Sequence, residues 1–463
     1  MPRSGRFLRF LGPATLVAVG YMDPGNWATD LEGGTRFGYQ LLWVLVASNV
    51  VALLLQSLAA RLGLVAGADL AQACRQHFST RVNFSLWFLA ELAIIACDLA
   101  ELLGSAVALN LLFGVPMVYG ALLTLFDVFL ILALQRRGAD RLEATVLTLL
   151  VTVAICLGVE LALAKPNLAE VASGLRPTLS AGSLYVAIGI VGATIMPHNL
   201  YLHSGLVKRC GPRPEDEHQR RILRRSFYGT ALALNLALLV NAAILVLAAA
   251  AFSKTPGAVS DLQSAYHLLA PVLGTGLASV LFAVGLLCSG TSATITGTLA
   301  GQIVMEGFLR IRLPAFQRRV FTRGLAIVPA VAVLAWAGES GTMRLLLASQ
   351  VILSLQLPFA IVPLIRFTSD PQLMGRFANP SWIKLAAGTS GVFITAANGA
   401  LISRTLDDLR QHSPIAAGLF AVAALAALAL LGWVCVVPLR RDAPGEVSDI
   451  QRAEWARKFR PNS

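Results

Sequence analysis

The chain has 463 residues, of which 56% are hydrophobic and only 13% are charged, and its formal net charge is +12 at pH 7. Soluble domains devote about a quarter of their residues to charge, so this composition excludes an ordinary water-soluble protein. The most basic stretch, residues 208–225, contains no aromatic residue, so the positive charge does not indicate nucleic-acid binding.

Long apolar blocks occupy most of the chain. A helix needs about 20 mainly apolar residues to cross a bilayer core. Because lipid-exposed backbone groups must be hydrogen-bonded within their own segment, each such block is predicted to be an α-helix. We therefore expect an all-α integral membrane protein with about 12 spans, at 11–30, 38–61, 84–113, 117–135, 142–163, 182–207, 227–252, 271–308, 321–338, 343–366, 380–402 and 413–438.

The positive charges are divided unevenly between the predicted loops. If both termini lie on one side, the segments on that side hold 30 of the 37 Lys and Arg residues. Cytoplasmic segments are enriched in these residues. We expect a multi-pass protein of the cell inner (plasma) membrane, with residues 1–10 and the tail 439–463 in the cytoplasm. The six scattered cysteines indicate neither a disulfide framework nor a zinc site.

The first block is interrupted by Asp23-Pro24-Gly25-Asn26. Proline removes a backbone donor and glycine adds freedom, so this sequence favours a break in the helix. A carboxylate inside a membrane adds a cost of roughly 2.5–3.5 kcal/mol. The same features suit an ion site, because an unwound turn frees carbonyl oxygens beside the side-chain oxygens of Asp23 and Asn26.

The third block contains three acids on one helical face, Glu91, Asp98 and Glu101. Acids inside membranes usually mark ion or proton pathways, and we expect a proton pathway here. The alternative is a cytoplasmic latch, in which these acids pair with arginines near the ninth block. The two roles are compatible, and the candidate partners are Arg318, Arg319 and Arg323.

The sixth block contains a matching interruption, with Met196-Pro197-His198-Asn199 following Ala193. Paired broken spans at corresponding positions in two halves are typical of inverted-repeat transporters with a substrate site at the bilayer midplane. His198 follows the break and is a candidate for proton coupling, with His203 a weaker one. Asn241, in the seventh block, is expected to form hydrogen bonds between helices.

The residues in the two breaks indicate which ion is bound. Oxygen ligands alone would suit Mg²⁺, Ca²⁺ or Na⁺, whereas the thioether of Met196 favours a first-row transition metal. We expect Mn²⁺ or Fe²⁺ as the transported substrate, with no cofactor. The positive charge of the metal should displace a proton from Asp23, which then leaves along the acids of the third block.

Five segments resemble the signatures of the Nramp (natural resistance-associated macrophage protein) family of divalent metal transporters, bacterial manganese/iron type. The similarity extends over residues 8 to 403, and Met196 is retained where the magnesium-type branch of the family replaces it. The segments are DPGN at 23–26, residues 90–101 in the third block, MPHN at 196–199, residues 290–308 and residues 354–359.

The resemblance implies a LeuT-like fold in which helices 1–5 (11–163) and 6–10 (182–366) form inverted repeats, with helices 1 and 6 broken and two helices (380–438) appended. It implies import of metal with protons by alternating access, as a monomer in membrane lipid. It also implies a proton path through Glu101 and Asp98. The implied metal ligands are Asp23, Asn26, the Ala193 carbonyl, Met196, a carbonyl near Gly20, and a glutamine of helix 10, with Gln350 the better match and Gln356 the alternative.

Three other functions compete with metal transport. A transporter of the same fold could carry an amino acid with Na⁺, but the fixed anion of Asp23 opposes an anionic substrate group. An intramembrane enzyme would need a nucleophile with a base, or a motif such as HExxH, and the sequence contains neither. A passive channel would show neither saturation nor a requirement for protons.

Overall fold

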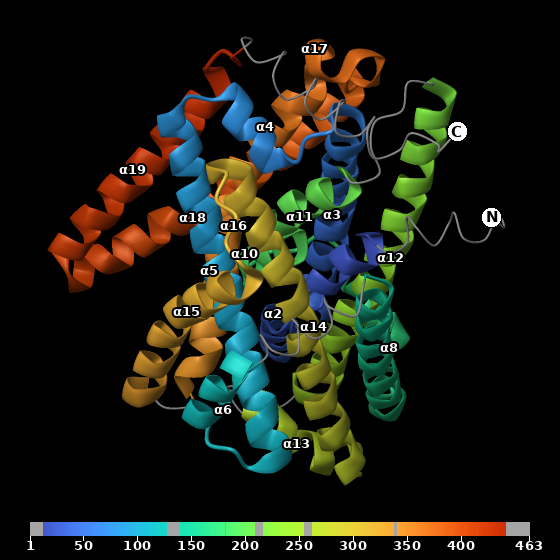
Figure 1. The fold of residues 1–463 in the computed structure, drawn as a ribbon. Coiled ribbons are helices and arrows are strands. Elements are labelled where there is room, and N and C mark those ends of the chain that lie inside the picture. Colours follow the sequence, from blue (N-terminus) through green and yellow to red (C-terminus); the bar gives the residue numbers. More distant parts are fainter. Residues whose placement is uncertain are drawn as a thin grey trace.

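The computed structural model describes residues 13–126, 139–180, 182–208, 216–253, 262–337 and 340–440. Within these ranges all regular elements are helices, arranged as a bundle of long rods (Figure 1). Residues 13–20 form the first helix. The predicted N-terminal segment and nearly all of the predicted tail lie outside the described residues.

The remaining α-helices are α2 (Pro24–Phe37), α3 (Leu42–Arg61), α4 (Leu70–His77), α5 (Thr80–Phe113), α6 (Met117–Leu123), α8 (Ala139–Ala164), α9 (Leu168–Ser173), α10 (Leu184–Ile195), α11 (Pro197–Lys208), α12 (Asp216–Phe252), α13 (Leu262–Leu273), α14 (Gly276–Leu309), α15 (Ala315–Ala337), α16 (Ser340–Ser369), α17 (Pro371–Met374), α18 (Ser381–His412) and α19 (Pro414–Val436). Short 3-10 or π turns join them at η1 (Gly38–Leu41), η2 (Leu62–Ala66), η3 (Thr124–Phe126) and η4 (Gly375–Phe377).

The prediction of an all-α membrane protein is confirmed. Ten stretches among the described residues are long and apolar enough to cross a membrane. The first, Pro24–Ala66, contains both α2 and α3, which are separated where Gly38 adopts φ 60° and ψ −135°. Glycine alone tolerates that backbone region well. The block predicted at 117–135 begins with α6 and η3, and the chain is not described from 127 to 138.

Several helices differ in length from the predicted blocks. Helix α12 begins at Asp216 rather than 227, and α18 continues to His412 rather than 402. The short helices α4, α9 and α17 were not predicted, because none is long enough to form an apolar block. Their ends are nevertheless encoded locally, since Asp69, Asn167 and Asp370 cap them as N-cap residues.

Both predicted breaks are present. The helix at 13–20 ends in a turn at 21–22, and α2 begins with Pro24 at its first position. Helix α10 ends at Ile195, and α11 begins directly afterwards with Pro197. Proline suits the first turn of a helix, where its missing N–H has no intrahelical partner, so each proline starts a new half-helix.

The broken helices lie at the centre of the bundle. Helix α2 packs against α5, α10, α12 and α16, while α5 runs alongside α14 and α16 (Figure 1). Helices α18 and α19 lie at the periphery (Figure 1), and Ala417 and Val434 are the buried residues of α19. Apolar helices therefore surround the two breaks on several sides.

Candidate metal-binding site

The first break presents the Asp23 carboxylate at the start of α2. Asp23 has extended backbone angles and caps the helix, so its Oδ1 accepts the backbone N–H of Asn26 at 2.9 Å. The side-chain amide of Asn26 donates to the same oxygen at 2.7 Å. Asp23 and Asn26 are both fully buried. A buried carboxylate is costly unless it is paired, and these two N–H groups stabilise its charge only in part.

The second break presents Met196 in an unusual backbone conformation. Met196 ends α10 with φ 43° and ψ 98°, in a region that residues with side chains rarely adopt. The Asn199 side chain donates to its sulfur at 3.5 Å. Helix α10 loses its regular bonding beyond Ile195, and the carbonyl of Ala193 faces the first break.

Hydrogen bonds connect the two breaks directly. The Asn26 amide nitrogen that contacts Asp23 also donates to the Ala193 carbonyl at 3.1 Å. Beside it, the Tyr21 hydroxyl donates to the Ile195 carbonyl at 3.3 Å. Asp23, Asn26 and Ala193 therefore meet at one place in the structure. A cation there would meet the same two oxygens that the Asn26 N–H groups contact.

Side chains of α12 and α14 form hydrogen bonds with the first break. The Asn241 side chain donates to the Tyr21 carbonyl at 2.7 Å and to the Asn26 side-chain oxygen at 3.3 Å. Ser289, on α14, donates to the Met22 carbonyl. These contacts use carbonyls that the break removes from helical bonding, and they fix the turn that carries Asp23.

Gln350, on α16, lies between the two breaks. A Cβ at Gly25 would overlap its side-chain amide, and a Cβ at Gly192 would overlap its backbone carbonyl. The side chain is fully buried, and its Oε1 has no hydrogen-bond partner within the described part of the chain. Gln356 lies elsewhere on α16, near Tyr201. The geometry favours Gln350 of the two predicted glutamines.

The donor set of this region is mixed. Asp23 Oδ2 and Gln350 Oε1 are buried oxygens without hydrogen-bond partners among the described residues, and buried polar atoms of this kind are uncommon. No group of three or more His, Cys, Asp or Glu side chains suited to a metal occurs in the described ranges. The region therefore offers one carboxylate, amide and carbonyl oxygens and one thioether, which suits a moderately bound transition-metal ion.

The predicted proton-pathway residues form a chain of contacts beside the second break. The His198 ring nitrogen Nε2 lies 3.7 Å from the Cys97 sulfur, which donates to Glu101 at 3.6 Å. Arg323 lies on α15. Its guanidinium nitrogen Nη2 is 3.8 Å from Glu101 Oε2, and its Nη1 donates to the backbone carbonyl of Asp98 at 2.7 Å. All five residues are almost completely buried.

Nearer the start of α5, the Glu91 carboxylate pairs with the Arg318 guanidinium at 2.8 Å. This contact and the Arg323–Glu101 contact are the carboxylate–arginine pairs that the latch hypothesis predicted. The side chain of Arg319, also predicted, lies outside the described residues. His203 contacts Gln56 at 2.9 Å, and Gln56 in turn donates to the Tyr21 hydroxyl, which places His203 in the support of the first break.

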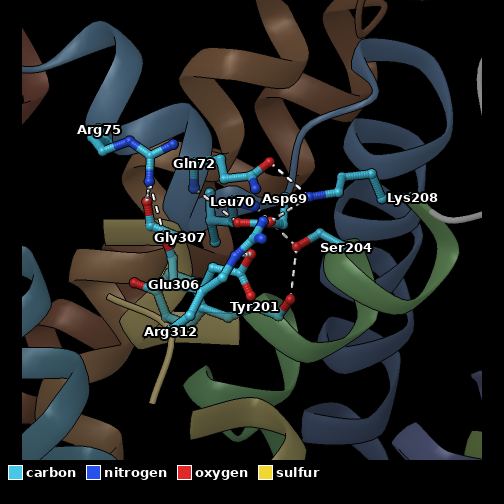
Figure 2. Close-up of polar contacts among 10 residues, drawn as sticks. All are labelled: Asp69, Leu70, Gln72, Arg75, Tyr201, Ser204, Lys208, Glu306, Gly307 and Arg312. Atoms are coloured by element: carbon cyan, nitrogen blue, oxygen red, sulfur yellow. Dashed lines mark hydrogen bonds and ion pairs between the residues drawn. The ribbon is translucent and has the colours of Figure 1, made fainter. Parts of the chain in front are cut away.

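A second polar network holds the far end of α11 (Figure 2). Lys208 donates to Asp69 at 3.0 Å and to Gln72 at 2.8 Å, so it joins α11 to α4. The Ser204 hydroxyl accepts the backbone N–H of Leu70 at 3.0 Å. Helix α4 therefore anchors the half-helix that begins at the second break.

The same short helix contacts α14 (Figure 2). Arg75 donates to the carbonyls of Glu306 and Gly307 at the end of α14, and Glu306 pairs with Arg312 at 2.8 Å. Sequence reasoning did not find this network, because α4 is short and polar and its residues are far apart along the chain from their partners. The cap Asp69 before α4 was the available signal.

Comparison with known proteins identifies the family. The model for natural resistance-associated macrophage protein-like (Nramp) proteins matches residues 14–404. A "Divalent metal cation transporter MntH" from Listeria monocytogenes is 51% identical over 418 residues, which cover 88% of this chain and 93% of that protein. A protein of the same name from Xanthomonas campestris is 53% identical over 412 residues, covering 87% and 93%.

Solved structures agree. A crystal structure of the Eremococcus coleocola manganese transporter superposes with a TM-score of 0.85 at 38% identity, covering 94% of this chain and 96% of that one. Mhp1, a nucleobase-cation-symport-1 family transporter, has a TM-score of 0.59 at 15% identity with 96% of both chains covered, which supports the LeuT-like fold alone. The predicted resemblance is confirmed, and this chain belongs to the Nramp family.

Proposed function

We propose that this chain imports Mn²⁺ or Fe²⁺ together with protons by alternating access. The observation that carries the proposal is the junction of the two breaks, where Asn26 contacts both Asp23 and the Ala193 carbonyl. Relatives named as divalent metal cation transporters and a manganese transporter structure support the metal assignment. The metal is the transported substrate, and we propose neither a cofactor nor a catalytic activity.

Asp23, Asn26, the Ala193 carbonyl, Met196 and Gln350 are the proposed ligands. Asp23 supplies the negative charge, and Met196 supplies the soft donor that selects against Mg²⁺. The buried, unpartnered oxygen of Gln350 beside Gly25 supports its place in the set over Gln356. For the metal to bind, the side-chain N–H groups of Asn26 leave Asp23 and Ala193, and the side-chain oxygen of Asn26 turns toward the metal, while the backbone N–H keeps its capping bond to Asp23.

Protons follow the contacts beside the second break. The metal charge displaces a proton from Asp23. The proton passes by His198 to Glu101 and the Asp98 region, and then toward Glu91 and the arginines of α15. The buried pairs Arg323–Glu101 and Arg318–Glu91 support a combined role, because a pair that separates during helix movement frees a carboxylate for a proton.

The chain is a multi-pass membrane protein, and we place it in the plasma membrane with both termini in the cytoplasm, as the distribution of arginine and lysine favours. Residues 11–163 and 182–366 form the two inverted repeats, and 380–438 form the appended helices. It acts as a monomer in lipid, since both breaks and every proposed ligand come from one chain.

An Asp23→Asn variant tests the proposal in proteoliposomes that contain a pH-sensitive dye. Asparagine caps a helix as well as aspartate, so the fold should persist. Removal of one member of a buried charged set costs about 3–5 kcal/mol, so Mn²⁺ uptake should fall by about 100-fold or more. Metal-stimulated acidification should fall with it, and wild-type uptake of Mn²⁺ should exceed that of Mg²⁺.

The matched control is Asp370→Asn, because Asp370 also caps a helix but lies at α17. It should transport like the wild type. Undiminished proton-coupled uptake in the Asp23→Asn variant would refute the site, and saturable metal uptake without acidification would refute the proton coupling alone.

A further inference from the structure

A cavity of about 270 Å³ lies between the last turn of α3 and the first half of α12, and none of its lining residues is a proposed metal ligand. Both helices change from polar to apolar here, since Arg61 is the last residue of α3 and the residues of α12 after Thr230 are apolar apart from Asn235 and Asn241. The polar residues that line it are Ser57, Arg61, Arg224, Ser226, Tyr228 and Thr230.

The lining of this α3–α12 cavity carries positive charge without any acidic residue. Arg61 is held in place because it donates to Asn379 at 3.1 Å. The guanidinium of Arg224 lies 5.6 Å from the centre of the Tyr228 ring. Such a cavity attracts an anion, and arginine is the side chain best shaped to bind a phosphate group.

A buried hydroxyl in the cavity lining lacks a hydrogen-bond partner among the described residues. Thr230 is 1% exposed, and its Oγ1 has no hydrogen-bond partner within the described part of the chain. An unpartnered buried hydroxyl is costly, so the native environment is expected to satisfy it. A ligand with several acceptor oxygens in the cavity would do so.

The surroundings indicate that the ligand has an apolar part. The side chains of Tyr228, Leu232, Leu236 and Leu239 are exposed at helical spacing along α12, starting at the cavity and continuing into the apolar run. Aromatic residues at the junction of basic and apolar segments mark the depth of lipid headgroups. A free anion would have no use for this exposed stripe, whereas an acyl chain could lie along it.

We propose that the α3–α12 cavity binds the phosphodiester headgroup of an anionic phospholipid, in the leaflet on the arginine-rich side of the membrane. Arg61 and Arg224 hold the phosphate, Thr230 donates to one of its oxygens, and an acyl chain follows the leucine stripe of α12. Basic pockets between membrane helices are known to take lipid headgroups of this class. The inference does not depend on which ion the protein transports.

The test measures retained lipid by native mass spectrometry of the full-length protein in detergent, with added phosphatidylglycerol or phosphatidylcholine. Both lipids carry the phosphodiester, but phosphatidylcholine adds a quaternary ammonium group, which the two arginines and the lack of an acidic lining residue disfavour, so phosphatidylglycerol should be retained about tenfold or more over phosphatidylcholine. Arg61→Gln/Arg224→Gln should abolish that preference. Thr230→Val, which keeps the side-chain shape, should reduce the retention of phosphatidylglycerol by about 10- to 100-fold, as expected for one hydrogen bond to a charged group.

The matched control is Arg221→Gln/Arg225→Gln, which removes the same charge from the same face of the membrane but not from the cavity lining. Equal retention of the two lipids by the wild type, or an equal loss in the control, would overturn the proposal. So would displacement of the lipid by inorganic phosphate at the same concentration, since the site would then serve a free anion. Melting temperatures of all variants establish that each is folded.

Discussion

The two breaks share the pattern x-Pro-x-Asn but are built in different ways. In the first, Asp23 has an ordinary extended backbone, and its carboxylate caps the helix that follows. In the second, Met196 has no group that can cap a helix, and its backbone adopts φ 43°. The charged residue therefore stabilises its own turn, whereas the thioether requires a turn that costs roughly 1–3 kcal/mol.

One side-chain contact is nevertheless common to both breaks. The asparagine three residues later turns back onto the candidate ligand atom, at 2.7 Å from Asp23 Oδ1 in the first break and 3.5 Å from the Met196 sulfur in the second. The asparagine therefore orients the ligand atom in each break, while the residue before the proline, Asp23 or Met196, determines whether the backbone is relaxed or strained.

After the loss of the Asp23 carboxylate, the largest effect is expected from added bulk in the first break. In a Gly25→Ala variant the new Cβ would overlap the Gln350 amide. Overpacking of this kind costs about 1–3 kcal/mol, so Mn²⁺ uptake should fall by about 10- to 100-fold. A Gly25→Ala/Gln350→Ala double variant lacks the overlap and should recover the melting temperature, while its uptake stays low because a proposed ligand is missing. Gly324→Ala, where a Cβ meets no neighbour within 4 Å, is the control. Normal uptake by Gly25→Ala would contradict the described contact.

Removal of each asparagine tests whether the Asn26–Asp23 and Asn199–Met196 contacts contribute equally to transport. Asn26→Ala removes a proposed metal ligand together with the side-chain bond that orients the Asp23 carboxylate, worth about 1.5–3 kcal/mol, and should lower kcat/KM for Mn²⁺ by about 10- to 100-fold. Asn199→Ala removes a weaker contact to sulfur and should lower kcat/KM by less than about tenfold. Asn235→Ala should have no effect on kcat/KM, because Asn235 is exposed on α12 and its side chain contacts Asn49 and the Ala231 carbonyl rather than either break. Equal losses for Asn26→Ala and Asn199→Ala would break the distinction drawn between the two breaks.

The smallest effect concerns stability. At Met196 the positive φ favours glycine, so Met196→Gly should be about 1 kcal/mol more stable than Met196→Ala. At Leu202, inside α11, the order should reverse, because glycine is about 1 kcal/mol worse than alanine in a helix. Melting temperatures of the four variants provide the measurement. The same order at both positions would show that the Met196 backbone is not strained in solution.

Local signals explain why so much of the fold and site was predictable. Apolar blocks long enough to span a bilayer admit few structures other than helices. Proline and glycine act on their own turn, so both breaks could be placed to the residue. In the structure Asn26 contacts both Asp23 and the Ala193 carbonyl, so the two breaks meet as the paired interruptions and the family resemblance indicated.

The remaining features depend on contacts between distant residues. Gln350 and Gln356 lie in the same helix, and their sequence does not reveal which one faces the breaks. The contact with Gly25 decides it. Asn241 was predicted to bond between helices, but its partners Tyr21 and Asn26 follow from the packing of α12 on α2. Cys97 is similar, because its position between His198 and Glu101 requires α5 and α11 to meet.

Helix α19 buries few of its residues, so lipid rather than protein covers most of its surface. Its C-terminal end is secured differently, since Arg366 donates to the carbonyls of Val434 and Val437. These are terminal carbonyls that lack intrahelical partners. One guanidinium therefore fixes the end of the final span to α16, at a helix with few buried side chains of its own.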